Sequence, residues 1–201
     1  MSLIEFVSDS ASNPLQVVED VASINSWAFE RSGDNEITIL VKGRHTDYQV
    51  CFTWMGEIEA LHLACSFDMK IPEARRAETQ RLIALINEQL WVGHFDIWMQ
   101  SGLIMYRQAL PLNGGLTATS LQCEAMLAGG VDASERYYPA IQFVVWAGKT
   151  AREAIDAAMF ETAGEECAGA NWSTRALTAS CRMPATAWDR SVAPSTPVRC
   201  S

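Results

Sequence analysis

The residues best suited to chemistry lie in the run from His94 to Trp98. His94, Asp96 and Trp98 occupy alternate positions, so an extended backbone places all three on the same side. A carboxylate that orients a histidine beside an aromatic ring can form an acid/base site or a ligand site. The alternative is a polar sheet face that solvent or a partner protein covers. We favour this second interpretation, because alternating polar residues are typical of any strand with one face uncovered.

A second arrangement would pair a cysteine nucleophile with one of the three histidines. The candidate is Cys65, which belongs to an alternating run that begins at Leu61. The alternation places it with Leu61, Leu63 and Phe67 on an apolar face, where a thiol behaves as a small hydrophobe. The six cysteines include no Cys-x-x-Cys pair. We therefore expect the three nearest the N-terminus to be reduced and buried.

The sequence does not indicate a metal or cofactor site. His62 and His94 lie on separate runs, and His45 lies in a turn where we expect it to be solvated. No His-x-x-x-His pair or nearby cysteine provides the ligand spacing of common zinc sites. The two Gly-Gly pairs follow no strand-to-helix phosphate pattern. We expect no enzyme activity, no cofactor and no metal, with an enzyme or small-ligand binder at the His94 run as the alternative.

Four tryptophans have different expected roles. Trp98 shares its face with polar residues, so we expect it to be exposed and to anchor a protein interface, where tryptophan is a common hot-spot residue. Trp54, Trp91 and Trp146 are expected to pack in the core or between helix and sheet. The residues predicted to bind a partner are Trp98, His94 and Asp96.

Changes of hydrophobic period predict the elements that position these residues. A helix is expected from Asn13-Pro14 to about Trp27, and another from Pro72 to Gly93. Later helices are expected at about residues 117–128, 139–148 and 151–162, and the first of these should end at Gly129-Gly130. Pro139 either starts the next helix or kinks a longer one begun near Ser134. The expected strands are 36–41, 48–54, 61–67, 94–99 and 103–109.

This order, α-β-β-β-α-β-β-α-α-α, predicts an α+β fold. Short turns between the strands favour a curved antiparallel sheet of about five strands packed against helices. We expect one domain over residues 1–166. Residues 167–201 contain no Ile or Phe and show no hydrophobic period, which predicts a disordered tail. The tail is either a short linear binding motif or the product of an altered reading frame.

The formal net charge of −9 is unevenly distributed. Residues 1–166 carry 11 Lys and Arg against 23 Asp and Glu, a charge of −12, whereas residues 167–201 carry +3. So acidic a body repels phosphates, and we expect neither nucleic acid nor membrane as a partner. The first residues lack the character of a secretory signal, and no run approaches the roughly 20 apolar residues of a membrane span. The expected location is the cytoplasm.

From about Asn13 to Glu165 the chain resembles the YbjN-domain family of bacteria. The resemblance is carried by Leu61 to Phe67, by Pro72-Glu73-Ala74-Arg75-Arg76, by Leu90-Trp91-Val92-Gly93-His94-Phe95-Asp96-Ile97-Trp98, and by the closing stretches Tyr137 to Trp146 and Ala154 to Gly164. It implies a fold similar to type III secretion chaperones, a tendency to form homodimers and a role in sensory transduction or stress. It brings no catalytic residues. We therefore expect a non-enzymatic protein-binding module, chaperone-like or regulatory, that holds an unidentified protein partner by strand addition or by helix-in-groove docking.

Overall fold

One antiparallel sheet with helices against it forms the described part of the chain. The computed structural model describes residues 13–165, so the expected tail lies outside the described residues. The six strands have the spatial order β1-β2-β3-β4-β6-β5. The α+β fold class predicted from the sequence is confirmed, with one strand more than expected. In chain order the elements are α1 (Leu15–Ile24), β1 (Ala28–Arg31), β2 (Glu36–Lys42), β3 (Asp47–Met55), the 3-10 turn η1 (Gly56–Ile58), β4 (Ala60–Lys70), α2 (Glu73–Asn87), β5 (His94–Trp98), β6 (Leu103–Pro111), α3 (Ser120–Val145) and α4 (Ala151–Glu165).

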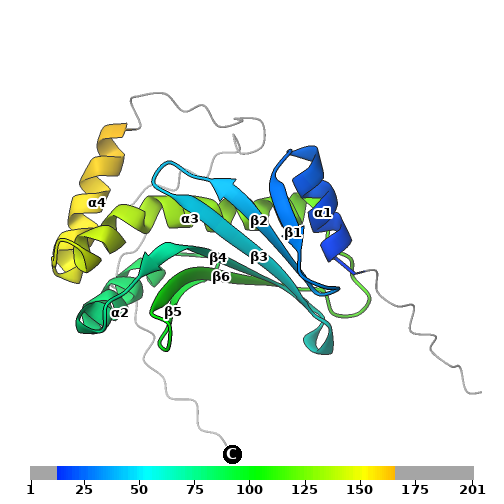
Figure 1. Ribbon diagram of the computed structural model, residues 1–201, viewed down its shortest axis with the longest axis horizontal. Helices are drawn as coiled ribbons and strands as arrows, with labels where there is room; N and C mark the ends of the chain where they lie inside the picture. The colour runs from blue at the N-terminus through cyan, green and yellow to red at the C-terminus, as the bar shows by residue number, and fades with distance from the viewer. Residues whose placement is uncertain (1–12, 166–201) are drawn as a thin grey trace, which may run out of the picture. The chain divides into compact units, whose positions relative to one another are not determined.

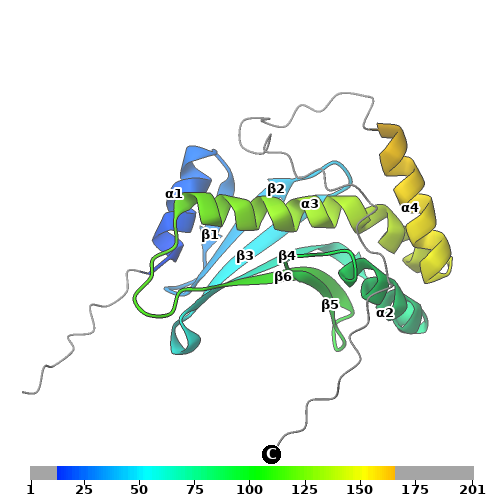
Figure 2. The same ribbon diagram turned by 180° about the vertical axis from the view of Figure 1, so that it is seen from behind.

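The helices α1 and α3 pack against the same face of the sheet. Figure 1 shows the curved strands in front of the long helix α3, and Figure 2 shows α3 crossing the sheet from the opposite side. The inward positions alternate along the strands as the sequence predicts, because successive side chains of a strand point to opposite faces. The fully buried side chains of this face include Ile37, Ile39, Val50, Phe52, Leu61, Leu63 and Cys65.

The strand β1 could not be predicted from hydrophobic alternation. All four of its side chains are exposed, so it lacks the alternation that marks a half-buried strand. The preceding helix also ends at Ile24, earlier than the predicted Trp27, because Ser26 adopts a left-handed φ of 56°. The amide of Trp27 then donates to the carbonyl of Ala22, which closes the helix end. The chain is thereby free to pair as β1 along β2.

The prediction that Gly129-Gly130 ends a helix is wrong. Both glycines lie inside α3, which runs for 26 residues and also contains Pro139. A side chain at Gly130 would meet the Leu63 Cδ2 atom at 3.1 Å and the Tyr106 Cδ1 atom at 3.4 Å. Glycine at this position therefore lets the helix backbone approach β4 and β6 closely. Its role is in helix–sheet packing rather than in helix termination.

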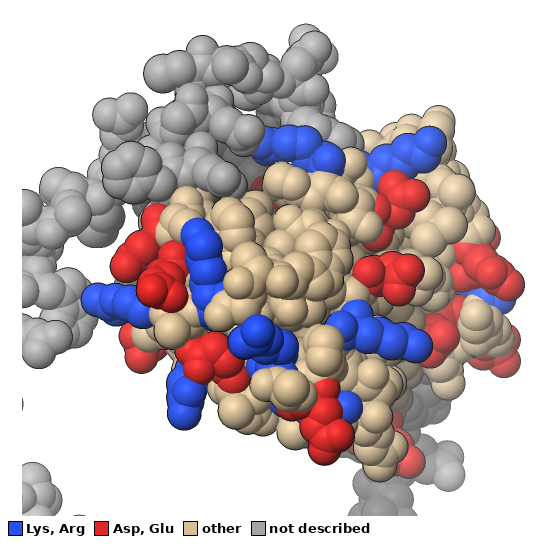
Figure 3. All heavy atoms as spheres, turned by 60° about the vertical axis from the view of Figure 1, so that its left-hand side comes forward, with Lys and Arg blue, Asp and Glu red and all other residues tan. Residues whose placement is uncertain are grey.

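The helices α2 and α4 lie at the β5 end of the sheet. The Glu78 side chain of α2 accepts a hydrogen bond from the first amide of α4, Ala151, at 2.7 Å. Thr150 and Glu153 form a capping box at the start of α4, since each side chain accepts a hydrogen bond from the other's backbone amide. Figure 3 shows this side of the molecule, where charges of both signs surround an uncharged area.

A matched pair of substitutions tests the packing role of Gly130. Gly130→Leu should lower the free energy of unfolding by about 1–3 kcal/mol, because the added side chain overfills the contact with β4 and β6. Gly129→Leu should raise it by up to about 1 kcal/mol, because no atom lies within 4 Å of a Cβ there and leucine favours helix. Urea unfolding of both variants measures the difference. Equal effects would contradict a close approach at Gly130.

Candidate functional site

The face of the sheet opposite α1 and α3 is covered by no helix among residues 13–165. The register aligns one row of side chains across this uncovered face, from β2 to β5. Most of its members are small or polar, and most are partly or fully exposed, which leaves the sheet accessible to another molecule. The row consists of Thr38, Cys51, Ala64, Arg107 and His94.

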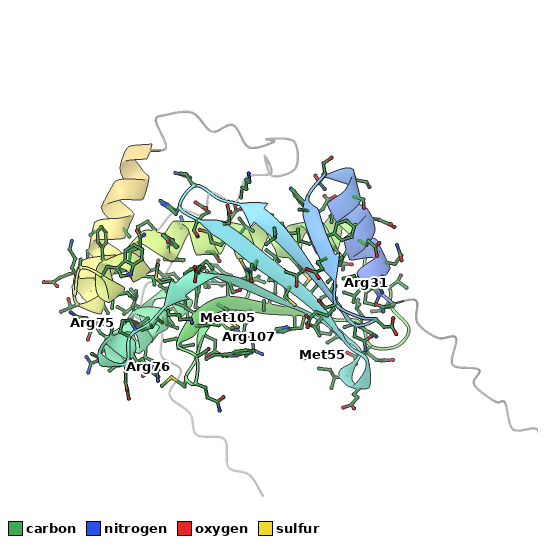
Figure 4. All side chains as sticks on the ribbon, in the orientation of Figure 1. Arg31, Met55, Arg75, Arg76, Met105 and Arg107 are labelled. Carbon is green, nitrogen blue, oxygen red and sulfur yellow. The ribbon has the colours of Figure 1, made fainter. Side chains whose placement is uncertain are left out.

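Arg107 is the centre of a polar cluster on the uncovered face. Its Nη1 atom donates to the Asp96 Oδ2 atom at 3.1 Å, and its Nε–H donates to the His62 Nε2 atom at 3.2 Å. His94 is the residue opposite Arg107 in the β5–β6 register. Figure 4 labels Arg107 beside Met105 on β6. The cluster therefore joins side chains from three strands, β4, β5 and β6.

The cluster holds His62 in its neutral form. Partial burial lowers the pKa of His62, and the positive charge of Arg107 and the proximity of His94 lower it further. Because Nε2 accepts a hydrogen bond from Arg107, the single imidazole proton of the neutral ring lies on Nδ1. His62 is thus uncharged at pH 7 and becomes cationic only on acidification.

The structure does not assemble the hypothesised pair of His94 oriented by Asp96. The Asp96 carboxylate instead bonds Arg107 through one oxygen and accepts the Ile97 amide at 2.8 Å through the other. Within residues 13–165, no group of three or more His, Cys, Asp or Glu side chains is arranged to hold a metal ion. The geometry favours recognition by charge and hydrogen bonding over acid/base chemistry.

A hollow of about 520 Å³ opens beside the cluster. Its rim includes Trp91 and Val92, whose side chains are 96% and 59% exposed. The Tyr106 hydroxyl donates to the Val92 carbonyl at 2.9 Å, and Gly93 (φ +70°) lies against the Tyr106 ring so closely that any side chain there would collide with it. The loop therefore presents two apolar side chains on a fixed backbone. The hollow is lined by His62, Trp91, Val92, Gly93, His94, Arg107, Gln108 and Ala109.

The predicted partner-binding residues lie along β5, on the uncovered face. Trp98 is 56% exposed and pairs with Leu103 at the hairpin end of the strand, outside the lining of the hollow. The prediction that Trp91 and Trp146 are packed is wrong, since they are 96% and 66% exposed. Trp91 lies in a loop after α2, where hydrophobic period carries no information. The position of Trp54, partly buried against the core, agrees with the expectation.

The sequence analysis missed Arg107 and the approach of His62 to it. One signal for Arg107 was present, because counting outward from the β5–β6 turn places it on the same face as His94. No signal was present for His62. Its contact with Arg107 depends on β6 pairing between β4 and β5, and local alternation does not specify that order.

Two other candidates for chemistry have structural roles. Cys65 is fully buried, accepts a 3.4 Å hydrogen bond from Ser134, and has its pKa raised by burial to about 12, so its thiol stays protonated. His45 is exposed in the turn between β2 and β3, as expected, and it also contacts α3. Its ring stacks on Tyr138 with centroids 5.4 Å apart, and its Nε2 atom lies 3.9 Å from the Glu135 carboxylate.

The fold places this chain among α+β proteins whose antiparallel sheet has one face covered by helices and one face uncovered. The chain belongs to the YbjN family, whose model matches residues 14–143 under the description "Putative bacterial sensory transduction regulator". This confirms the resemblance seen in the sequence. No curated protein matches the chain.

Three solved structures are similar to this chain. The ExsC–ExsE complex matches with a TM-score of 0.49 and 17% identity, over 64% of this chain and 93% of that one. The HopA1–SchA chaperone–effector complex matches with a TM-score of 0.41 and 15% identity, over 59% and 87%. YbjN from E. coli matches with a TM-score of 0.43 and 8% identity, over 76% and 93%. None of the helices among residues 13–165 has the length and apolar character needed to span a membrane.

The electrostatics of the cluster can be measured directly. The pKa of His62 should lie below its usual 6.5, and Arg107→Gln should raise it, because the substitution removes a neighbouring positive charge. A lowered native pKa means that His62 makes the fold less stable as the pH falls through and below 6.5. Histidine NMR titration of wild type and variant measures both values. A His62 pKa unchanged by Arg107→Gln would contradict the contact.

Proposed function

We propose that this chain is a non-enzymatic regulatory protein of the cytoplasm that acts as a homodimer and binds a protein partner. The observation that carries the proposal is the uncovered sheet face, bordered at β5 by exposed aromatic side chains. Trp98 at one end of β5 and Trp91 before the other are 56% and 96% exposed. Tryptophan and arginine are the residue types that most often dominate protein interfaces. Membership of a family described as regulatory supports the same conclusion.

The shape of the hollow favours a protein over a small ligand. Small-molecule sites usually enclose most of the ligand surface. Here Trp91 and His94 on the rim are exposed, so the hollow is open to solvent. An open hollow beside a flat sheet suits a side chain that projects from a partner. The small-ligand alternative lacks the enclosing walls that it would need.

The β5 edge of the sheet is partly closed to an added strand. The Asn87 side chain of α2 bonds both the amide and the carbonyl of Phe95, at 2.8 and 3.1 Å. These bonds occupy groups that an added strand would need. Strand addition at β5 is therefore disfavoured, and docking across the uncovered face is the mode that we propose. His94, Asp96 and Trp98 contact the partner in this mode.

The charge distribution supports a protein partner rather than nucleic acid. On the side shown in Figure 3, Lys and Arg alternate with Asp and Glu and do not form a continuous basic area. Nucleic-acid binding depends on clustered cations that displace counterions from the phosphates. The side of the molecule that Figure 3 shows therefore lacks the clustered cations that nucleic-acid binding needs.

Light scattering tests the proposal. The 22.2 kDa chain should have a molar mass of about 44 kDa as a dimer.

Trp98→Ala should weaken self-association or partner binding about 10- to 100-fold, because it removes an exposed aromatic anchor. Trp146→Ala is the control, since this exposed residue is the C-cap of α3 and is not part of β5. A wild-type monomer at every concentration would refute the homodimer, and equal losses in both variants would refute the Trp98 contact.

A further inference from the structure

The guanidinium of Arg107 has hydrogen-bonding capacity that the fold does not use. Nε and Nη1 are occupied by His62 and Asp96, and Nη2 bonds no acceptor among residues 13–165. The side chain is 34% exposed and lines the hollow. Guanidinium groups bind carboxylates through strong charge-assisted hydrogen bonds. The uncovered face thus offers an N–H donor that an anionic oxygen can accept from.

His62, beside this site, adds positive charge when it is protonated. His62 already contacts Arg107, and His94 lies opposite Arg107 in the register. On the neighbouring strand β3, the residue paired with His62 is Thr53, which is neutral. Among residues 13–165, the acidic side chain that contacts Arg107 is Asp96, and it neutralises Arg107 in part. Arg107 and Asp96 offset each other's charge, so protonation of His62 makes the cluster more positive as the pH falls.

An apolar wall stands next to the cationic groups. Trp91 and Val92 line the same hollow as Arg107, His62 and His94. The Val92 carbonyl accepts a hydrogen bond from the Tyr106 hydroxyl, so little backbone entropy is lost when a partner packs against this loop. The hollow thus has a charged side and an apolar side.

We propose that this hollow binds a carboxylate of a partner protein segment, an Asp or Glu side chain, while a neighbouring apolar side chain of that segment packs on Trp91 and Val92. The proposal rests on the protein-binding function inferred above and adds the chemistry of the partner. Charge complementarity at Arg107 selects the carboxylate. The net negative charge of the body does not prevent this contact, because salt screens charges farther away than about 8–10 Å.

Binding of a carboxylate should depend on pH. A bound carboxylate stabilises protonated His62, so the pKa of His62 is higher in the complex than in the free protein. Affinity should therefore rise as the pH falls through the pKa of the complex, and level off below the pKa of the free protein. His62→Gln should reduce this dependence.

Two capped dipeptides provide the probe, acetyl-Glu-Leu-amide and acetyl-Gln-Leu-amide. The Glu peptide should bind about tenfold more tightly than the Gln peptide at pH 6, measured from histidine NMR shifts and tryptophan fluorescence. Arg107→Gln should abolish that preference. Asp96→Asn should strengthen Glu binding, because it removes a competing carboxylate. Arg152→Gln on the exposed surface of α4 is the control and should change nothing.

Three outcomes would overturn the proposal. These are equal binding of the Glu and Gln peptides, a Glu preference that survives Arg107→Gln, and binding of acetate as tight as that of the Glu peptide. If the carboxylate preference is absent while Trp98→Ala still weakens association, the inference about partner chemistry fails and the proposed function stands. If Trp98→Ala has no effect and the Glu preference is present, the proposed interface at Trp98 fails on its own.

Discussion

The close approach of α3 to the sheet is the contact on which the rest of the structure depends. Gly130 allows the helix backbone to lie against Leu63, Cys65 and Tyr106. One long helix can therefore cover most of one sheet face with the help of α1. The apolar face of every central strand is buried in this way, and the other face is left without cover. An antiparallel sheet tolerates this asymmetry because its strands alternate apolar and polar side chains.

Tyr106 connects this packing to the candidate site. Its ring packs on the Gly130 side of the core, with centroids 5.7 Å from Phe95, while its hydroxyl holds the Val92 carbonyl. Its neighbour Arg107 points to the uncovered face and gathers His62 and Asp96. Successive residues of β6 thus secure the core and build the surface cluster. The rigidity of the hollow follows from the packing beneath it.

The hydrophobic period of neighbouring residues predicted those features of the fold that depend on neighbouring residues alone. The five alternating strands and the buried state of Cys65 could be predicted from neighbouring residues. The exposed strand β1, the continuation of α3 through Gly130 and the contact of His62 with Arg107 were not. Each of these depends on contacts between segments that are distant in sequence. The strand β1 depends on pairing with β2, the continuation of α3 on its contact with the sheet, and the His62 contact on the order of the strands. Tertiary packing overrides local propensity at such positions.

The central claim is that a protein partner contacts the uncovered face at β5. Site-specific photo-crosslinking from position 98 tests it most directly, with the same photoreactive residue at position 146 as the comparison. Both native residues are exposed tryptophans, at 56% and 66%, so the label is similarly accessible at the two positions. The account predicts a discrete cross-linked species, a dimer or a partner complex, from position 98 and none from position 146. Cross-links from position 146 alone would contradict it.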